Sequence, residues 1–295
     1  MIRLMRNIGF TNSILIGIIF LLWISLFFIS GLFSVYAWTL LKMVLPIVGL
    51  LGIIINIILF IVFIIRKKKM RKLCVNLIVN IVLAFPLLMT MNIIILAYPN
   101  NLEHAKPSIT VKWPFTEQTV IGWGGDTVEN NLPHVIWSSE RWAYDLVMDP
   151  YDIGSSNNED YGIWNKEVHS PVSGTVIAAY DEEADIVPGS EQFISLEGNH
   201  VYIKAEKTGT YILLNHLKKE SVTVKVGDHV NQGDVIGRVG NSGSTSEPHL
   251  HIHHQRQDPT KVIYPILAEG LPLFFEDISG ESMPQKGDII TRNIQ

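Results

Sequence analysis

Four histidines stand within six positions in the stretch SEPHLHIHHQ, residues 246–255. In a β-strand, side chains two positions apart share a face, so His249, His251 and His253 would point the same way. Imidazole nitrogens gathered in this manner can bind one metal ion or exchange protons with one water molecule. The spacing therefore favours a metal site or an acid–base pair over a solvated strand edge, most strongly for His249 and His251.

The other face of the same strand would carry Leu250, Ile252 and His254. The two aliphatic side chains are expected to enter the core, which leaves the other three imidazoles on an open face. His253 and His254 are interpreted as structural, with His253 on the face of the site.

Further ligands should lie upstream of this strand, because a hydrolytic zinc site keeps three protein ligands and one open position. The upstream candidates are His134, Asp145, which ends the phrase RWAYD, and His216, which ends the apolar phrase YILLNH. His104 is the only other upstream histidine outside the expected strands.

The second half of the chain is predicted to form a mostly antiparallel β-domain, a sandwich that positions these side chains. Its apolar runs are short, rich in Val, Ile and Tyr, and separated by Gly, Asp, Asn or Pro. The expected strands are 175–180, 193–196, 201–205, 211–216, 222–226, 235–239 and 250–254.

One phrase of this half, VKVGDHVNQGDVIG at 224–237, is similar to phrases of lipoyl- and biotinyl-like carrier domains and of glucose-type phosphotransferase subunits. By itself it indicates a β-sandwich and no function. A carrier needs an acceptor lysine at a hairpin tip, whereas Lys225 lies before the turn and within a strand. A carrier function is therefore disfavoured.

The first third of the chain contains three uncharged apolar runs, at 14–35, 44–65 and 73–98. Each is as long as or longer than the roughly 20 helical residues that cross a bilayer. All three are predicted to be transmembrane helices within a region 1–98. Asn and Pro interrupt the third run, but neighbouring helices can satisfy the polar groups that such residues leave.

The orientation follows from the basic loop RKKKMRK at 66–72, because short cationic loops stay on the cytoplasmic side. Arg3 and Arg6 place the N-terminus on that side too. The first run is too long for the apolar part of a cleaved signal peptide, so it is expected to be retained. We therefore predict a multi-pass protein of the cell membrane, embedded in the lipid bilayer, with residues 99–295 outside the cytoplasm.

Residues 99–117 contain three prolines and little periodicity, which predicts a linker before a domain at 118–295. Beyond residue 100 the chain has 14 Lys and Arg against 28 Asp and Glu, a net charge near −14. This acidity argues against nucleic acid as a partner. Cys74 is the only cysteine, so an intramolecular disulfide is excluded.

Four phrases of the second half stand in the order found in the lysostaphin-like (LytM-type) zinc metallopeptidases. They are PVSGTV at 171–176, GNHVYI at 198–203, NHL at 215–217 and GSTSEPHLH at 243–251. The chain resembles that family over roughly residues 130–275, and the joint pattern is more specific than any phrase alone.

The resemblance implies one zinc ion held by His134, Asp145 and His251. It places His216 and His249 beside the water that the metal activates, where they would take its proton, stabilise the oxyanion and protonate the leaving amine. The usual family spacing is His-x-x-x-Asp, whereas ten residues separate His134 from Asp145 here. The longer spacing before RWAYD is similar to a variant of the family.

A domain of this family that faces outward is expected to hydrolyse peptide bonds in peptidoglycan as a zinc metalloendopeptidase. The alternative is a catalytically silent member that serves as a membrane-anchored binding or regulatory module at the cell wall. All five implied site residues are present, which favours catalysis. The scissile bond stays unpredicted, because specificity depends on loop conformations.

Overall fold

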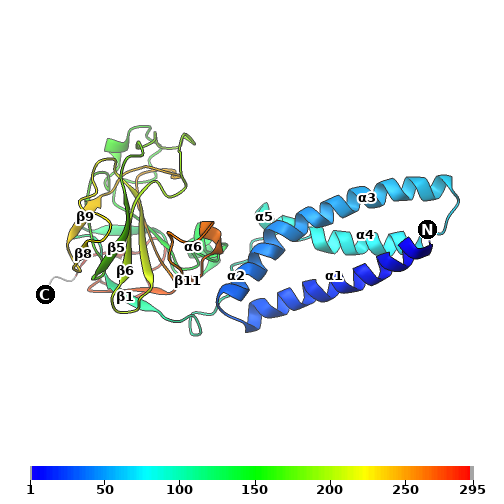
Figure 1. The fold of residues 1–295 in the computed structure, drawn as a ribbon. Helices are drawn as coiled ribbons and strands as arrows, with labels where there is room; N and C mark the ends of the chain where they lie inside the picture. The colour runs from blue at the N-terminus through cyan, green and yellow to red at the C-terminus, as the bar shows by residue number, and fades with distance from the viewer. Residues whose placement is uncertain (1, 293–295) are drawn as a thin grey trace. The chain divides into compact units, whose positions relative to one another are not determined.

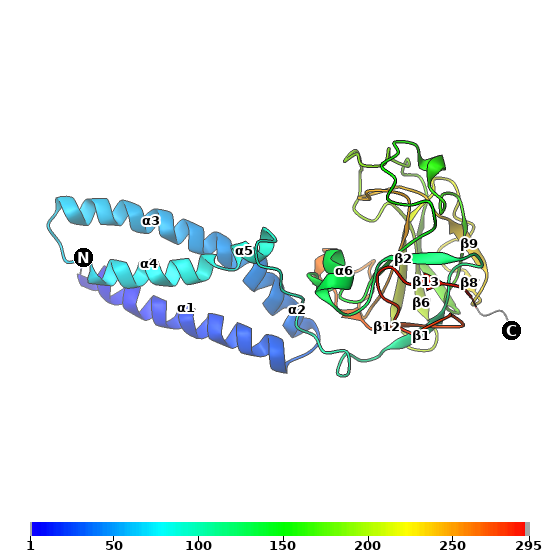
Figure 2. The ribbon, with the colours of Figure 1, turned by 180° about the vertical axis from the view of Figure 1, so that it is seen from behind.

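The computed structural model describes the backbone of residues 2–292 and the side chains of residues 10–292. The chain divides into two compact units, Met1–Asn100 and Asn101–Gln295 (Figures 1 and 2). The first unit is helical and the second consists mostly of strands.

The helical unit contains three long apolar helical stretches. Its elements are α1 (Ile2–Phe28), α2 (Leu32–Thr39), the π-helical turn η1 (Leu40–Val44), α3 (Leu45–Ile65), α4 (Arg71–Ala84) and α5 (Leu87–Thr90). Helix α4 packs against both α1 and α3, and the three run side by side (Figure 1). Most of their aliphatic side chains are exposed, as expected for helices whose surroundings are lipid.

Three segments are long and apolar enough to cross a membrane: Phe10–Phe28, Leu32–Ile65 and Arg71–Thr90. Their bounds differ from the predicted 14–35, 44–65 and 73–98. The first helix ends before Gly31, which has a φ of 88°. The second continues through 36–43 because that stretch contains neither Gly nor Pro. The third is interrupted at Pro86, which lacks an amide hydrogen for the helix, and 91–98 form no helix.

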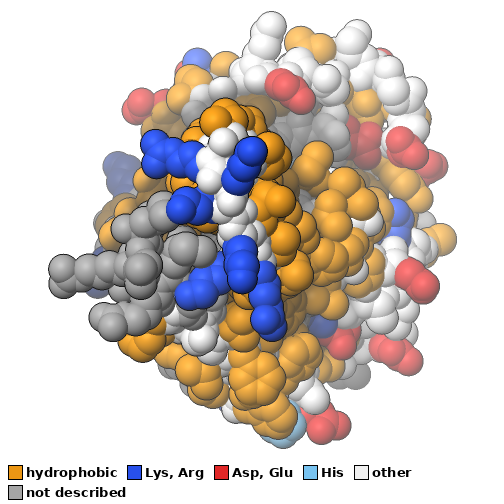
Figure 3. Space-filling view, turned by 90° about the vertical axis from the view of Figure 1, so that its right-hand side faces the viewer, with side chains coloured by type: hydrophobic (Ala, Val, Ile, Leu, Met, Phe, Trp, Pro, Cys, Tyr) orange, Lys and Arg blue, Asp and Glu red, His pale blue; other side chains and the backbone are white. Residues whose placement is uncertain are grey.

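The basic loop joins α3 to α4, and the side chains of residues 66–72 are exposed. Figure 3 shows Lys and Arg side chains gathered among hydrophobic ones in the view along these helices. Because Asp and Glu are absent from residues 1–100, no acidic side chain of that unit neutralises the loop.

The β unit follows in a single run of short elements. They are β1 (Ile109–Lys112), β2 (Thr119–Trp123), α6 (Val128–Val135), β3 (Tyr144–Val147), η2 (Asn158–Asp160), β4 (Glu167–His169), β5 (Gly174–Tyr180), β6 (Asn199–Ala205), β7 (Tyr211–Leu217), β8 (His229–Val230), β9 (Val235–Arg238), β10 (Leu250–Gln255), η3 (Pro265–Leu267), β11 (Gly270–Leu271), β12 (Leu273–Glu276) and β13 (Ile289–Ile290).

The main sheet has the strand order β13-β2-β3-β10-β7-β6-β5-β8, with β11 paired to β10. Every pairing in it is antiparallel, as is that of β4 with β9. The pair β1–β12 is parallel. The predicted fold class, long apolar helices followed by a mostly antiparallel β-domain, is therefore confirmed.

The expected linker differs from the structure in its second half. Ile109, Val111, Trp113 and Phe115 alternate along the chain and are buried in the core of the β unit. Strand β1 pairs with β12, more than 160 residues later, in the register Ile109↔Leu273. The folded domain thus begins before residue 118, because this alternation supplies an apolar face that the main core covers.

Two of the expected strands are absent from the described structure. Ile194 and Leu196 are 87% and 61% exposed, and Val226 is 64% exposed, so 193–196 and 222–226 lie in surface loops. Their apolar character alone does not provide the partner strand that a sheet requires.

Candidate metal centre

Strand β10 lies near the middle of the main sheet and holds His251 against two neighbouring strands. Its pairing with β3 sets His251 directly opposite Asp145, and Nδ1 of His251 lies 3.0 Å from Oδ1 of Asp145. Its pairing with β7 sets Asn215 opposite His251 on the other side. The ring of the next residue, His216, lies with its centroid 5.9 Å from that of His251. The register of β10 with β3 therefore brings His251 and Asp145 together, and His216 joins them from β7.

His134 reaches the same point from α6, which contacts β2 beside the sheet (Figure 2). Thr127 caps the start of the helix, and its side chain accepts a hydrogen bond from the backbone amide of Asn130. The helix kinks at Asn131, where φ is −145°. Nε2 of His134 lies 3.3 Å from Oδ2 of Asp145. One ligand atom from each of His134, Asp145 and His251 lies within 4.8 Å of the others.

The tautomer of His134 follows from its neighbour Asn131, which is fully buried. The Asn131 amide nitrogen donates to two backbone carbonyls, those of Gly125 and Ala143, at 3.0 Å each. Its Oδ1 must therefore face Nδ1 of His134, 2.7 Å away, and accept the Nδ1 hydrogen. A neutral His134 then presents the lone pair of Nε2 to the carboxylate.

His249 and His216 are held in the same tautomer by backbone carbonyls. Nδ1 of His249 donates to the Glu247 carbonyl at 2.8 Å, and Nδ1 of His216 donates to the Ser242 carbonyl at 2.8 Å. Both Nε2 atoms therefore carry lone pairs, and that of His249 lies 3.5 Å from Oδ1 of Asp145. The two rings lie with their centroids 4.7 Å apart.

These contacts set lone pairs of imidazole against a carboxylate, which is repulsive unless a cation or a proton lies between them. Burial alone would raise the pKa of Asp145, yet the surrounding histidines, His134 first, hold it well below its usual value. Burial would lower the pKa of His134, but the charge of Asp145 outweighs the effect of burial, and the pKa of His134 is raised. The site thus attracts positive charge, and two imidazoles with one carboxylate suit Zn²⁺.

His216 has a different electrostatic environment. Burial lowers its pKa well below the usual value, and the neighbouring rings of His249 and His251 add to the shift. The ring is neutral near pH 7 and can accept a proton at Nε2. Its backbone φ of 62°, rare for a residue with a side chain, is the kind of strain found at functional sites.

The face that carries the histidines differs from the predicted open one. His249, His251 and His253 are only 9%, 5% and 5% exposed, and Leu250 and Ile252 on the opposite face lie in the core as expected. His254 is buried too, between the Thr210 hydroxyl at 2.6 Å and the Pro272 carbonyl at 3.0 Å. It has no contact with the cluster, in keeping with the structural interpretation.

The cluster forms part of the wall of a cleft with a volume of about 910 Å³. His134, Asp145, His216, His249 and His251 all line it. Aromatic and acidic side chains form much of the remaining wall: Trp123, Trp137, Tyr151, Tyr161, Glu140, Asp152, Glu197 and Glu247. The cleft is large enough for an extended peptide segment, and its acidic wall suits a substrate with amino groups.

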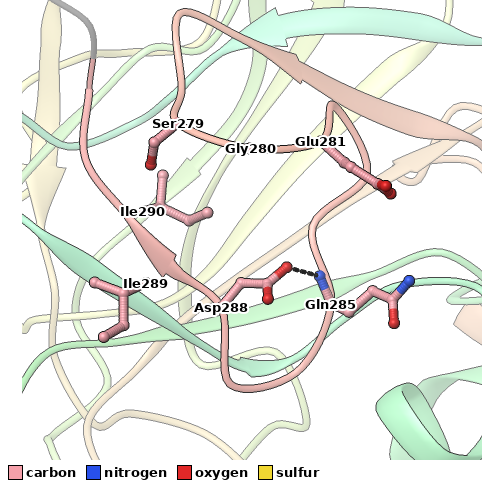
Figure 4. Close-up of a pocket in the computed structure, with 7 residues that line it drawn as sticks. All are labelled: Ser279, Gly280, Glu281, Gln285, Asp288, Ile289 and Ile290. Carbon is pink, nitrogen blue, oxygen red and sulfur yellow. Dashed lines mark hydrogen bonds between the residues drawn. The ribbon is translucent and has the colours of Figure 1, made fainter.

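A second, smaller hollow is formed by the C-terminal segment from Ser279 to Ile290 (Figure 4). Of its acidic side chains, Asp288 already accepts a hydrogen bond from the backbone amide of Gln285 at 2.8 Å. The hollow has no histidine and shares no residue with the cleft. It therefore offers no comparable set of ligands or bases.

Residues 159–262 match the model of a known family, peptidase family M23. These residues belong to an M23 peptidase domain. The matched stretch includes His216, His249 and His251, whereas His134 and Asp145 precede it.

Two curated proteins are similar to this chain. Endolysin 2638A of Staphylococcus phage 2638A is 29% identical over 157 residues, which are 50% of this chain and 32% of the endolysin. The peptidoglycan DD-endopeptidase ShyC of Vibrio cholerae is 35% identical over 82 residues, 28% of this chain and 17% of that enzyme. The chain thus spans about a third or less of the length of these relatives.

Among solved structures, lysostaphin from Staphylococcus simulans is similar with 20% identity and a TM-score of 0.32. The similarity covers 51% of this chain and 46% of lysostaphin.

The structure brings together all five predicted site residues, and His104 lies apart from them in an exposed turn. Sequence reasoning missed Asn131, although its position three residues before His134 is the spacing at which side chains meet across a helical turn. It also missed the carbonyls of Ser242 and Glu247. Such backbone acceptors carry no sequence signal, because every residue has one.

Proposed function

We propose that the M23 domain is a zinc metalloendopeptidase that hydrolyses peptide bonds of peptidoglycan on the outer side of the cell membrane. The observation that carries the proposal is the direction of the imidazoles. The Nδ1 hydrogens of His134, His216 and His249 are tied to acceptors outside the cluster, so three Nε2 lone pairs face the cleft beside Asp145. This arrangement supports metal binding and proton transfer at one point.

His134, Asp145 and His251 would hold the metal, since their ligand atoms already lie together. Zinc in such a site supplies Lewis acidity, which polarises a peptide carbonyl and lets water lose a proton near neutral pH. The carboxylate offsets part of the metal charge and orients both imidazoles through its two oxygens.

His216 and His249 would perform the proton transfers. Each has a lone pair on Nε2 that can accept a proton from the attacking water, and each ring is held in place by its Nδ1 hydrogen bond. Once protonated at Nε2, either ring can donate a hydrogen bond to the developing oxyanion and then give the proton to the leaving amine. Two bases on one side of the cleft allow one to remove the proton while the other stabilises charge.

Three findings support peptidoglycan as the substrate. The similar curated proteins include a peptidoglycan endopeptidase and a phage endolysin. The cleft is wide enough for a peptide and lined by carboxylates. The basic loop between α3 and α4 favours an arrangement in which the helices anchor the chain with the M23 domain outside.

The test uses the full chain purified in detergent, with bound zinc measured by elemental analysis. It is then incubated with purified sacculi, and new free amines are followed by mass spectrometry of the released muropeptides. We expect one zinc per chain and a single class of newly exposed amine. An Asp145→Ala variant serves as the inactive control, and zinc-loaded protein that releases no amine would contradict the proposal.

A further inference from the structure

A row of polar side chains continues from His251 along the same face of β10. Nε2 of His251 lies 2.9 Å from Nδ1 of His253, and Nε2 of His253 lies 3.3 Å from Oε1 of Gln255. The amide nitrogen of Gln255 donates to the backbone carbonyl of Gln257 at 2.7 Å. His253 and Gln255 are 5% and 3% exposed, so water is largely excluded from the row.

The backbone carbonyl at the end of this row determines the direction of every hydrogen bond in it. A carbonyl only accepts, so the Gln255 amide nitrogen must face Gln257 and its Oε1 must face His253. Nε2 of His253 therefore carries the hydrogen, and Nδ1 of a neutral His253 is an acceptor. Nε2 of His251 must then be the donor to it.

The consequence for His251 concerns its other nitrogen. With the hydrogen on Nε2, the lone pair of Nδ1 is directed at the cluster, where it lies 3.0 Å from Oδ1 of Asp145. Without His253, the hydrogen would be favoured on Nδ1, because it could then donate to the carboxylate. That alternative tautomer blocks the nitrogen that the metal needs.

We propose that His253 is a positioning residue for the metal centre, which Gln255 and the Gln257 carbonyl orient so that His251 offers Nδ1 as a ligand. The inference rests on the proposed metal site and extends it to residues outside the ligand set. His253 acts on His251 as Asn131 acts on His134: each accepts the hydrogen of the ring nitrogen that faces away from Asp145. A partner of this kind for a ligating histidine typically changes metal affinity 10–100-fold when removed.

The first measurement reads the direction of the row. The full-length, zinc-loaded protein is labelled with ¹⁵N-histidine, and the imidazole nitrogens are assigned by NMR. We expect the hydrogen of His253 on Nε2 and that of His251 on Nε2, with an exchange-protected signal for the latter. A hydrogen on Nδ1 of His253 would overturn the proposal, because the row would then run the opposite way.

The second measurement compares zinc affinity in full-length variants by competition with a chelator. His253→Phe removes the acceptor and should weaken zinc binding about 10–100-fold. His253→Gln restores an acceptor and should bind zinc more tightly than His253→Phe does. His254→Phe is the matched control, since it removes an equally buried imidazole with two hydrogen bonds from the opposite face.

Unchanged zinc affinity in His253→Phe would overturn the proposal. Equal weakening of zinc affinity in His253→Phe and His254→Phe would also overturn it, because it would indicate a general loss of packing. If His253→Phe does not fold, Gln255→Leu takes its place, because it removes the orienting amide and leaves every imidazole intact. Unchanged affinity in that variant would then overturn the proposal. Wild-type protein that binds zinc but cleaves no peptidoglycan would contradict the proposed function alone.

Discussion

Each of the four cluster histidines has one ring nitrogen directed at the cluster and the other held by a hydrogen-bond partner outside it. His216, for example, uses Nδ1 to reach the Ser242 carbonyl and keeps Nε2 free. His249 does the same with the Glu247 carbonyl. Because an imidazole has only two nitrogens, fixing one of them decides the chemistry of the other. The tautomers of the site histidines are therefore determined by hydrogen bonds to groups outside the site.

Substitutions of the two histidines of the HxH pair should separate metal binding from turnover. We expect His251→Ala to lose zinc, because it removes a ligand, and His249→Ala to keep zinc while turnover falls about 10²–10⁴-fold, the usual effect of losing an acid–base group. Elemental analysis and amine release measure the two properties. His229→Ala, an exposed histidine paired with Glu206, should change neither. Zinc loss in His249→Ala would contradict the proposed role of His249 in proton transfer and indicate that it binds the metal.

The elements that matter most for the site are β10 and the loops that follow β5 and β9. Strand β10 supplies His251 and has neighbours on both sides, so its position depends on the whole sheet. The loop that follows β9 supplies both carbonyls that hold His216 and His249, those of Ser242 and Glu247. Gly198 and Ser242 lie in two of these loops and are in close contact.

Gly198→Ala should disturb His216 without touching a ligand. A Cβ at this position would lie 2.3 Å from the Ser242 carbonyl oxygen, and the φ of +62° adds strain of roughly 1–2 kcal/mol for a residue with a side chain. We expect turnover to fall more than zinc affinity, because the displaced carbonyl holds His216. The matched control is Gly209→Ala, with a φ of +71° and open space around its Cβ. Equal effects of the two substitutions on turnover would contradict this expectation.

The stability of the β unit should depend on pH through His254 of β10. Burial lowers the pKa of His254 to about 4, from 6.5, and the nearby charge of Arg256 adds to the effect. Between these values the unfolded chain binds the proton and the folded one does not, so stability is complete above pH 6.5 and falls as pH decreases to 4. The loss is roughly 3 kcal/mol.

This pH dependence can be measured by thermal unfolding of the zinc-free protein at several pH values. His254→Asn should flatten the decrease of stability between pH 6.5 and 4, whatever its effect on stability at pH 7. His216 and His253, whose pKa values burial also lowers, contribute in the same direction, and His134 in the opposite one. An unchanged slope in His254→Asn would show that the other histidines determine it.

At the scale of the whole molecule, the chain combines three candidate membrane spans with an M23 domain. The helical unit has nine Lys and Arg and no acidic residue, and most of the charge lies in the loop 66–72. The β unit carries the excess of Asp and Glu. The cationic loop, rather than the acidity of the β unit, supports the proposed orientation, because only Lys and Arg of short loops bias it.

The proposed orientation can be tested by labelling cysteines, since the chain has only Cys74. In a Cys74→Ser background, Lys207→Cys introduces a thiol in the β unit and Lys68→Cys one in the basic loop. A membrane-impermeant maleimide applied to intact cells stripped of outer layers should label the first variant only. Both should react after permeabilisation, and labelling of Lys68→Cys in intact cells would reverse the orientation.

Several parts of this protein could be predicted from sequence because they depend on local periodicity. The alternation of HLHIH placed Leu250 and Ile252 in the core and two site histidines on the other face, and the long apolar runs indicated helices. The resemblance to M23-type peptidases supplied the identity of His134 and Asp145, which no period could. The helix bounds were less accurate, since Gly31 and Pro86 act within apolar runs that composition alone cannot divide.

The sequence by itself thus determined the class of elements, the family and the set of residues able to bind a metal. Only the tertiary structure decided that β1 belongs to the domain through its pairing with β12. It likewise decided that His251 on β10 lies opposite Asp145 on the neighbouring strand β3. It also decided the tautomers, since Asn131, His253 and the loop carbonyls act through hydrogen bonds whose direction depends on where the chain returns in space. Contacts between distant segments leave no periodic pattern in the sequence. The site residues could therefore be predicted, whereas their tautomers could not.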